Sequence, residues 1–273
     1  MFNMKTFSEY YSNIGNLLLD CETKLPDILE YYNYDYCEAS KHITKWIKTT
    51  FKDVPNYEIP FIVFEGERCA GKDSVIDELS ENSDFVPLPR KTNNLAWSIL
   101  NERKQNCYFK LDNPIESTFL WYSDLAFRIS SWEIDDFSKT YLANRYIDSA
   151  CICIKSCYDN DLSIEEKQSL EELLDSFRFL FPVPEKTLIL DVTQETQRKR
   201  LFETRGRVLS KEEEDVAIKN IKCFSEIDFS NVYHVDANQV LEDVMKSVYN
   251  CGYDNSRSCA KQSTAKLEDF EIV

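Results

Sequence analysis

A loop framed by two glycines constrains this chain more than any other feature of its sequence. The apolar run at 61–64 is followed by Gly66, four further residues, Gly71 and Lys72. The chain has 5 glycines, against roughly 19 at average usage, so two of them at this spacing indicate a backbone requirement. Glycines let backbone N–H groups turn toward an anion, the lysine adds a point charge, and a following helix adds its positive end. The segment predicts a phosphate-binding loop between a strand and a helix.

Short apolar runs alternate with longer stretches of helical period from residue 60 to about 249. The expected strands are 61–64, 84–88, 139–143, 187–192 and 232–236. The expected helices are about 72–81, 114–133, 147–158, 164–179, 194–204, 210–226 and 238–249. Strands that alternate with helices imply parallel connections. The sequence therefore predicts an α/β fold, with a doubly wound parallel five-stranded sheet flanked by helices.

The two ends of the chain have different patterns. Residues 1–57 are rich in aromatic side chains and hold two amphipathic stretches, Ile14–Leu19 and Ile43–Phe51, so we expect a helical N-terminal extension. Residues 251–273 are polar and lack an apolar period, which predicts a disordered tail. The domain that carries the loop is expected at 58–250.

Charge and hydropathy exclude several classes of partner. The formal net charge is −16, and a polyanionic surface repels nucleic acid and acidic membranes, so neither is an expected partner. No apolar run approaches the roughly 18 residues that a membrane span needs. The first residues show no signal-peptide pattern, so a cytoplasmic location is expected. The 10 cysteines show no paired metal spacing, which favours reduced thiols.

Five segments, taken in order, resemble the thymidylate kinase family, including its relatives that act on UMP and CMP. They are the strand and loop at 61–74, the helix segment Phe119–Ser123, Asn144-Arg145-Tyr146, Leu188–Arg207 and Val235-Asp236-Ala237. The resemblance covers about 59–249. It implies a nucleoside monophosphate kinase that uses ATP and Mg²⁺ and transfers the γ-phosphate to a pyrimidine (deoxy)nucleoside monophosphate such as dTMP. It also admits a homodimer through the helix at 114–133.

The resemblance implies a role for individual residues. Lys72, Arg145 and Arg205 match the residues that steady the charge of the transferred group, where positioning and electrostatics do most of the work. The residues implied to bind ATP are Gly66, Cys69, Ala70, Gly71, Lys72, Asp73, Ser74, Arg200 and Arg207. The residues implied to bind the acceptor are Glu67, Arg68, Arg90, Tyr122 and Arg145.

Two of these assignments keep open alternatives. Tyr122 aligns with the aromatic residue that stacks on the acceptor base, yet core packing of Tyr122 or Trp121 fits the sequence equally well. Arg128, on the same helix, could reach the base or the phosphate. Arg90 follows the second strand in a loop whose sequence matches poorly, so a plain surface loop is the alternative there.

Positive charge gathers near one end of the matching region. Six basic residues fall within fourteen positions: Arg198, Lys199, Arg200, Arg205, Arg207 and Lys211. Such a concentration in an acidic protein predicts a lid that closes over polyphosphate and excludes water. The alternative is a solvated basic helix face paired with the acidic run at 212–214.

Three positions depart from the family pattern. Asp73 replaces the Ser or Thr whose hydroxyl binds Mg²⁺, with Ser74 one place later, and Asn144 replaces an Asp. The number of carboxylates is unchanged, so we hypothesise that the metal carboxylate has moved to Asp73, with Asp73 and Ser74 as metal ligands. The competing hypothesis is decay to an inactive nucleotide-binding pseudokinase or scaffold. Arg68 stands where the family has an Asp that faces the acceptor sugar. An arginine side chain cannot accept a hydrogen bond, so the identity of the acceptor base and sugar stays open.

A deoxynucleoside kinase is the remaining alternative, because it shares the fold and the loop. That reaction needs a carboxylate base beside the acceptor hydroxyl, and Glu65 at the end of the first strand is the candidate. Val235-Asp236-Ala237 and the basic lid fit the monophosphate kinases better.

Overall fold

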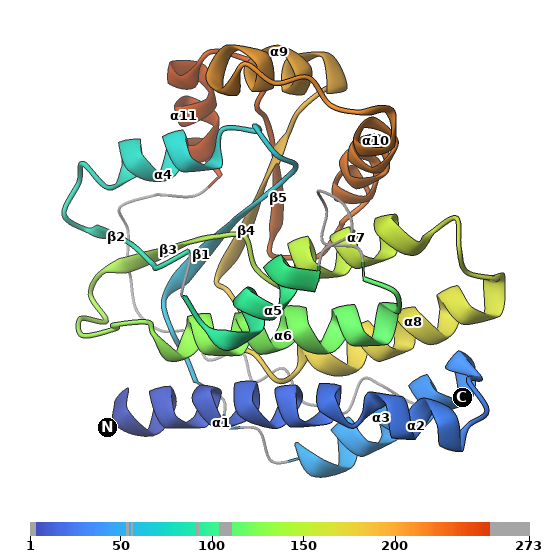
Figure 1. The fold of residues 1–273 in the computed structure, drawn as a ribbon. Coiled ribbons are helices and arrows are strands. Elements are labelled where there is room, and N and C mark those ends of the chain that lie inside the picture. The colour runs from blue at the N-terminus through green and yellow to red at the C-terminus, as the bar shows by residue number, and fades with distance from the viewer. Residues whose placement is uncertain (1–3, 53–54, 56, 91–92, 104–110, 252–273) are drawn as a thin grey trace.

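A parallel sheet forms the centre of the molecule. The computed structural model describes residues 4–52, 55, 57–90, 93–103 and 111–251. Its five strands are β1 (Phe61–Glu65), β2 (Phe85–Pro87), β3 (Thr140–Asn144), β4 (Lys186–Asp191) and β5 (Val232–Asp236), in the order β2-β3-β1-β4-β5 (Figure 1). All four strand pairs are parallel. The predicted α/β class is confirmed, and each strand lies within one or two residues of its expected bounds.

Helices cover both faces of the sheet. Those after β1 are α4 (Lys72–Leu79), α5 (Leu95–Arg103), α6 (Pro114–Ser130), α7 (Ile147–Tyr158), α8 (Ile164–Arg178), α9 (Gln194–Arg205), α10 (Lys211–Ser225) and α11 (Leu241–Asn250). Val75 and Leu79 of α4 and Val248 of α11 pack with Phe64 on one face. The helices α6, α7 and α8 cover the other (Figure 1). The sheet is therefore enclosed on both sides, and its carboxyl edge remains for a site.

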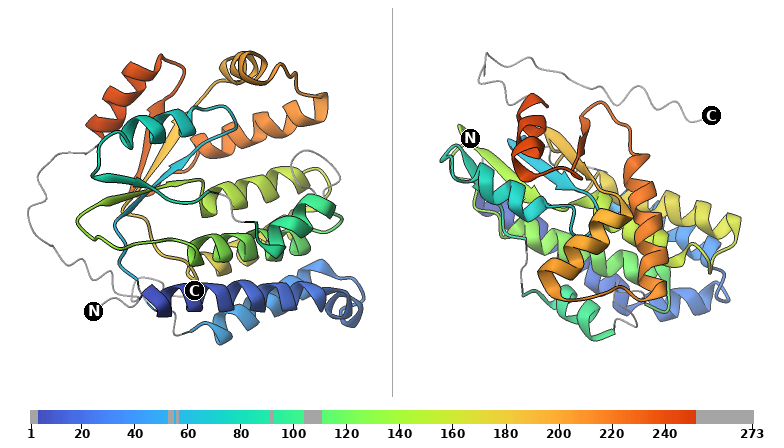
Figure 2. Two further views of the ribbon diagram at one scale, coloured as in Figure 1. Left: turned by 60° about the vertical axis from the view of Figure 1, so that its left-hand side comes forward. Right: turned by 90° about the horizontal axis from the view of Figure 1, so that it is seen from above.

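The first fifty residues are part of the principal core. They form α1 (Met4–Thr23), α2 (Leu25–Tyr31) and α3 (Tyr36–Thr50), and α1 lies along α6 while α3 lies along α8 (Figures 1 and 2). Phe7 and Tyr11 are fully buried in the same cluster as Phe61 of β1. These helices add a layer outside α6 and α8, which would otherwise present apolar faces to water.

Close backbone approach fixes α1 against α6. A Cβ at Gly15 would lie 2.9 Å from the ring of Phe127, so only glycine fits there. The hydroxyl of Ser123 donates to the Gly15 carbonyl at 2.6 Å, and that of Ser8 donates to the Ser130 carbonyl at 2.7 Å. A second copy could not dock on this face of α6 without displacing α1.

Two further expectations concern membrane-spanning helices and the C-terminal tail. Among the residues that the structure describes, no helix has the length and apolar character to cross a membrane. The expected tail, 251–273, lies outside the described residues except for Cys251.

Candidate functional site

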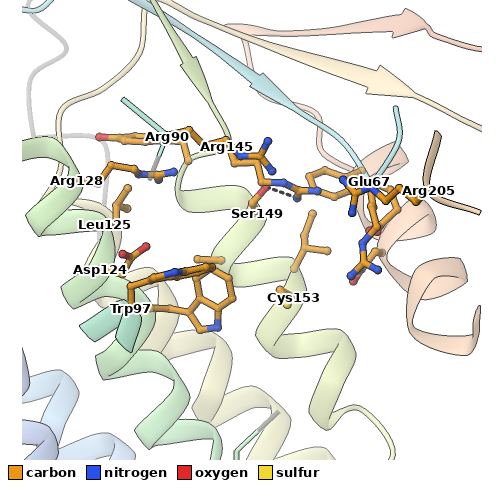
Figure 3. A pocket seen from close by; sticks show the side chains of 17 residues that line it. Glu67, Arg90, Trp97, Asp124, Leu125, Arg128, Arg145, Ser149, Cys153 and Arg205 are labelled. Carbon is orange, nitrogen blue, oxygen red and sulfur yellow. Dashed lines mark hydrogen bonds between the residues drawn. The ribbon is translucent and has the colours of Figure 1, made fainter. Parts of the chain in front are cut away.

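Two cavities open at the carboxyl ends of β1 and β3. The first, here the helical cavity, has a volume of about 220 Å³ and is bounded by α5, α6, α7 and α10 (Figure 3). The second, here the loop cavity, has a volume of about 480 Å³ and runs along residues 68–75 to the start of α11. Four arginines line both cavities: Arg68, Arg90, Arg145 and Arg205. Sequence-distant segments therefore bring guanidinium groups to one shared wall.

The loop between β1 and α4 requires its glycines. Gly66 has φ +124°, and a Cβ there would lie 2.6 Å from the Leu190 carbonyl oxygen of the neighbouring strand β4. Gly71, the residue before α4, has φ +98°. Side chains rarely adopt either conformation. Of the residues implied to bind ATP, Cys69, Ala70, Gly71, Lys72, Asp73, Ser74 and Arg200 line the loop cavity.

Lys72 is folded back into the loop. Its Nζ donates to the carbonyl oxygens of Gly66 at 2.7 Å and Glu67 at 2.8 Å, and the residue is only 5% exposed. Burial, and next the charge of Arg145, hold the pKa of the Lys72 ammonium well below its ordinary value. A polyphosphate in the loop cavity would supply the opposite charge that this ammonium lacks.

This geometry predicts proton uptake on ATP binding. Bound phosphate raises the pKa of the Lys72 ammonium toward its ordinary value of about 10.4. At a pH between the lowered pKa and this ordinary pKa, the ATP-bound protein therefore holds more protons than the free protein. ATP affinity should therefore fall as pH rises above about 8, where ATP itself no longer titrates. Calorimetry in two buffers with different ionisation enthalpies measures the uptake. Equal uptake by wild type and Lys72→Met would contradict the assignment to Lys72.

The two departures Asp73 and Asn144 contact each other. The Asn144 amide Nδ2 donates to Oδ1 of Asp73. Arg90 Nη1 lies 2.9 Å from Oδ1 and 3.1 Å from Oδ2 of the same carboxylate. The Oδ1 atom of Asn144 is buried and has no hydrogen-bond partner among the described residues. The carboxylate thus sits at the end of β3, beside the start of α4, with a second side-chain oxygen nearby.

These residues fit a magnesium ion. Mg²⁺ takes oxygen ligands, commonly one or two carboxylates, and completes its shell with phosphates and water. Asp73 offers an exposed carboxylate, which the Asn144 amide holds by its hydrogen bond to Oδ1. Ser74 lines the same cavity. Among the described residues, no three His, Cys, Asp or Glu side chains form a metal cluster, so phosphate and water would supply the other ligands.

Arg145 is held at the junction of β3 and α7. Its φ is +67°, which residues other than glycine rarely adopt, and its backbone N–H donates to the Phe64 carbonyl at 3.0 Å. Its Nη1 donates to the Ser149 hydroxyl at 3.0 Å. The strained backbone aims the guanidinium at the wall between the cavities, which is where a group passing between them would need it.

Glu65 serves the start of α7 rather than a cavity. Its Oε1 accepts from the backbone N–H groups of Tyr146 at 2.7 Å and Ser149 at 3.1 Å, and its Oε2 accepts from the Ser149 hydroxyl. Burial, and next the charge of Asp148, raise the pKa of the Glu65 carboxyl. The side chain is fully buried and lines neither cavity. The idea that Glu65 is a catalytic base is therefore wrong.

The end of the helical cavity away from the loop has aromatic walls. Trp97 of α5 and Trp121 of α6 line it, with Asp124 and Arg128 one helical turn apart (Figure 3). Asn94 Nδ2 donates to Asp124 Oδ1 at 2.8 Å. Burial raises the pKa of the Asp124 carboxyl, against the opposite effects of Arg128 and Asn94. Flat rings beside a donor and an acceptor can hold and read a planar base.

The assignment of Tyr122 to base stacking is wrong. Tyr122 is fully buried. Its ring stacks on Phe177 with centroids 4.5 Å apart, and its hydroxyl contacts Cys151 Sγ at 3.0 Å and the Leu174 carbonyl at 3.2 Å. One residue along a helix turns the side chain by about 100°, so Trp121 faces the cavity and Tyr122 faces the core.

The arginines of the predicted basic lid make three kinds of contact. Arg205 is exposed and lines both cavities. Arg200 donates to the carbonyls of Cys69, Ala70, Ala237 and Gln239, so it ties the loop to the start of α11. Arg198 pairs with Glu214 at 2.8 Å, and Arg207 pairs with Glu213, which caps α10. Arg207 lines neither cavity, so its expected contact with ATP is not present in this conformation.

Sequence reasoning missed several lining residues. Trp97 and Asp124 were not proposed, and α5 was not expected at all. The available signal was Asn94, whose Oδ1 accepts from the Trp97 backbone N–H at 2.8 Å as the cap of that helix. Glu67 and Arg68 line the helical cavity, as the resemblance implies for acceptor-binding residues.

Comparisons with known proteins give a likeness of fold. No family model matches the chain, and no curated protein matches it. A solved deoxyadenosine kinase from M. mycoides with bound dATP superposes with a TM-score of 0.51 and 17% identity, over 70% of this chain and 97% of that one. A thymidylate kinase from Candida albicans superposes with a TM-score of 0.51 and 20% identity, over 70% and 90%. The chain therefore has the fold of the P-loop nucleoside and nucleotide kinases.

Proposed function

We propose that this protein is a nucleoside monophosphate kinase that transfers the γ-phosphoryl group of ATP to its acceptor. The observation that carries the proposal is the wall of four arginines, Arg68, Arg90, Arg145 and Arg205, between the two cavities. In a chain of net charge −16, so dense a positive wall suits phosphate on both of its sides. A monophosphate acceptor provides that charge on the second side.

The geometry supports an in-line transfer across this wall. ATP would occupy the loop cavity, with Lys72 and the loop N–H groups at its β- and γ-phosphates. The acceptor would occupy the helical cavity, with its base against the aromatic wall that Trp97 and Trp121 form. An oxygen of the acceptor phosphate attacks the γ-phosphorus as the bond to the β-bridging oxygen breaks, which gives ADP and a nucleoside diphosphate. Arg145 and Arg205 stabilise the charge spread over the transferred group.

A bound Mg²⁺ ion would neutralise phosphate charge during this step. Asp73 and Ser74 are the residues that would hold it at the loop cavity, with the Asn144 amide positioning Asp73. The resemblance to the thymidylate kinases implies a pyrimidine acceptor such as dTMP.

A deoxynucleoside kinase is a second candidate, because a carboxylate other than that of Asp124 reaches the helical cavity. Glu67 lines it and is only 3% exposed, with Gln197 Nε2 3.4 Å from its Oε1. A buried carboxylate there could accept the proton of a nucleoside hydroxyl. The arginine wall weighs against this candidate, since a nucleoside acceptor leaves four positive charges with phosphate on one side only.

A panel of acceptors separates these functions. The protein is incubated with ATP and Mg²⁺ and with each of dTMP, dUMP, UMP, CMP, dCMP, dAMP and dGMP, and in parallel with thymidine, deoxycytidine and deoxyadenosine, and ADP release is measured. We expect turnover on at least one monophosphate, with a pyrimidine preferred, and none on the nucleosides. Lys72→Met is the control for contaminating kinase activity.

Each other outcome points to a different function. Turnover on a nucleoside alone would establish the deoxynucleoside kinase. ATP binding by calorimetry without turnover on any acceptor would favour the inactive nucleotide-binding protein.

A further inference from the structure

We propose that the ion pair of Arg90 and Asp73 couples the two halves of the proposed kinase site. In the free protein Arg90 pairs with the carboxylate of Asp73, which would hold the metal. The phosphate of the acceptor draws Arg90 away and so releases Asp73 for Mg²⁺. The inference rests on the proposed function, because it needs a donor with its metal on one side of the arginine wall and a phosphate on the other.

The contacts place Arg90 between two competing anions. One nitrogen, Nη1, reaches both carboxylate oxygens of Asp73, at 2.9 and 3.1 Å. Arg90 also lines the helical cavity, where Arg128 lies beside it and the acceptor phosphate would approach (Figure 3). The two side chains are 40% and 67% exposed. Neither is locked by packing, so the pair can exchange partners without a change of fold.

Charge decides which partner Arg90 takes. A phosphate monoester carries up to two negative charges and three acceptor oxygens, whereas a carboxylate carries one charge. A guanidinium group binds both in the same forked geometry. A bound acceptor phosphate therefore competes well for Arg90. A Mg²⁺ ion at Asp73 acts in the same direction, because the ion and the guanidinium repel each other across one carboxylate.

Asn144 keeps Asp73 in place during the exchange. Its Nδ2 donates to Oδ1 of Asp73 from the end of β3, an element fixed by pairing with β1. A carboxylate at position 144 would repel Asp73 instead. The neutral amide thus allows the loop carboxylate to lie against the strand end and to stay there after Arg90 has left.

The expected coupling is small but measurable. The upper part of the range for exposed ion pairs, about 0.4–1 kcal/mol, corresponds to an effect of about two- to fivefold. The readout is the ratio of two ATP dissociation constants, measured in EDTA and in Mg²⁺, which reports how much the metal strengthens ATP binding. Because coupling is reciprocal, an acceptor that releases Asp73 must raise this ratio.

The test uses Arg90→Gln, Asp73→Asn and the double variant, without any acceptor. Arg90→Gln should raise the ratio about two- to fivefold, and Asp73→Asn should lower it. In the Asp73→Asn background, Arg90→Gln should have no further effect. Arg198→Gln, whose side chain pairs with Glu214 away from both cavities, is the matched control and should leave the ratio unchanged.

A second arm adds an equimolar mixture of dTMP, dCMP, dAMP and dGMP and replaces ATP by a non-hydrolysable analogue, so that no phosphoryl transfer occurs during the measurement. The mixture should raise the wild-type ratio and leave that of Arg90→Gln unchanged. The proposal would be overturned if Arg90→Gln still changed the ratio in the Asp73→Asn background. It would also be overturned if the mixture left the wild-type ratio unchanged.

Failure of this inference differs visibly from failure of the proposed function. Absence of ATP binding under both conditions would refute the kinase itself. Turnover on the acceptor panel with an unchanged ratio would refute only the coupling.

Discussion

Replacing Arg145 by methionine should lower the turnover number about 1,000-fold. Its guanidinium lies on the wall between the cavities, where charge spreads in the transition state. Methionine is unbranched and uncharged and meets the same positive φ, so the substitution removes the guanidinium without adding a new kind of backbone strain. Steady-state ADP release with the best acceptor of the panel measures the loss.

Arg198→Met is the matched control for this effect. Arg198 is also an arginine, yet it pairs with Glu214 and lines neither cavity. Its turnover should stay within about twofold of wild type, since the loss of an exposed ion pair is small. An equal loss of turnover in the two variants would show that the position of Arg145 is unimportant and that only the overall positive charge matters. Unchanged melting temperatures for both variants exclude unfolding as the cause.

Replacing Phe7 by alanine should lower the free energy of unfolding by about 3–5 kcal/mol. Phe7 is fully buried, and its ring packs edge-on against Tyr11 at 4.9 Å and Tyr57 at 5.0 Å between centroids. A cavity left there would open within the cluster that contains Phe61 of the central strand. Equilibrium unfolding in urea measures the change as a shift of the midpoint.

Tyr31→Ala provides the comparison within the same N-terminal segment. Tyr31 is 79% exposed at the end of α2, so its loss should change stability by no more than about 0.5 kcal/mol. A Phe7→Ala effect as small as that of Tyr31→Ala would mean that residues 1–57 are an appendage, as their sequence suggested. The expected difference would show that they belong to the principal core.

Local pattern was sufficient to predict the strands and most helices. The apolar runs at 61–64 and 187–192 are short and bounded, and they became buried parallel strands because both faces of the sheet are covered. The helix α5 was not predicted because its apolar residues do not lie along one face of the helix. Tyr122 was misplaced for a related reason. Trp121 and Tyr122 are adjacent in sequence, and only the packing of α8 and α6 shows which of them faces the core.

The site was predictable in its parts but not in its contacts. Glycine spacing identified the loop, since Gly66 has no room for a Cβ beside Leu190. The link between Asp73 and Asn144 was inferred by counting carboxylates, and the two side chains do touch. The partner Arg90 could not be inferred, because nothing in sequence separates a guanidinium that faces the acceptor from one that faces Asp73. Asp124 and Trp97 depend on α5 docking against α6.

The layer formed by α1 and α3 has a consequence for how the chain folds during synthesis. The hydrogen bonds from Ser8 to Ser130 and from Ser123 to Gly15 join residues 122 and 108 positions apart. During synthesis α1 must therefore wait for α6, and α3 must wait for α8, before either can bury its apolar face. Such distant closures make folding slow and leave apolar surface exposed for longer. The apolar faces of α1 and α3 thus need protection in the nascent chain until α6 and α8 have been made.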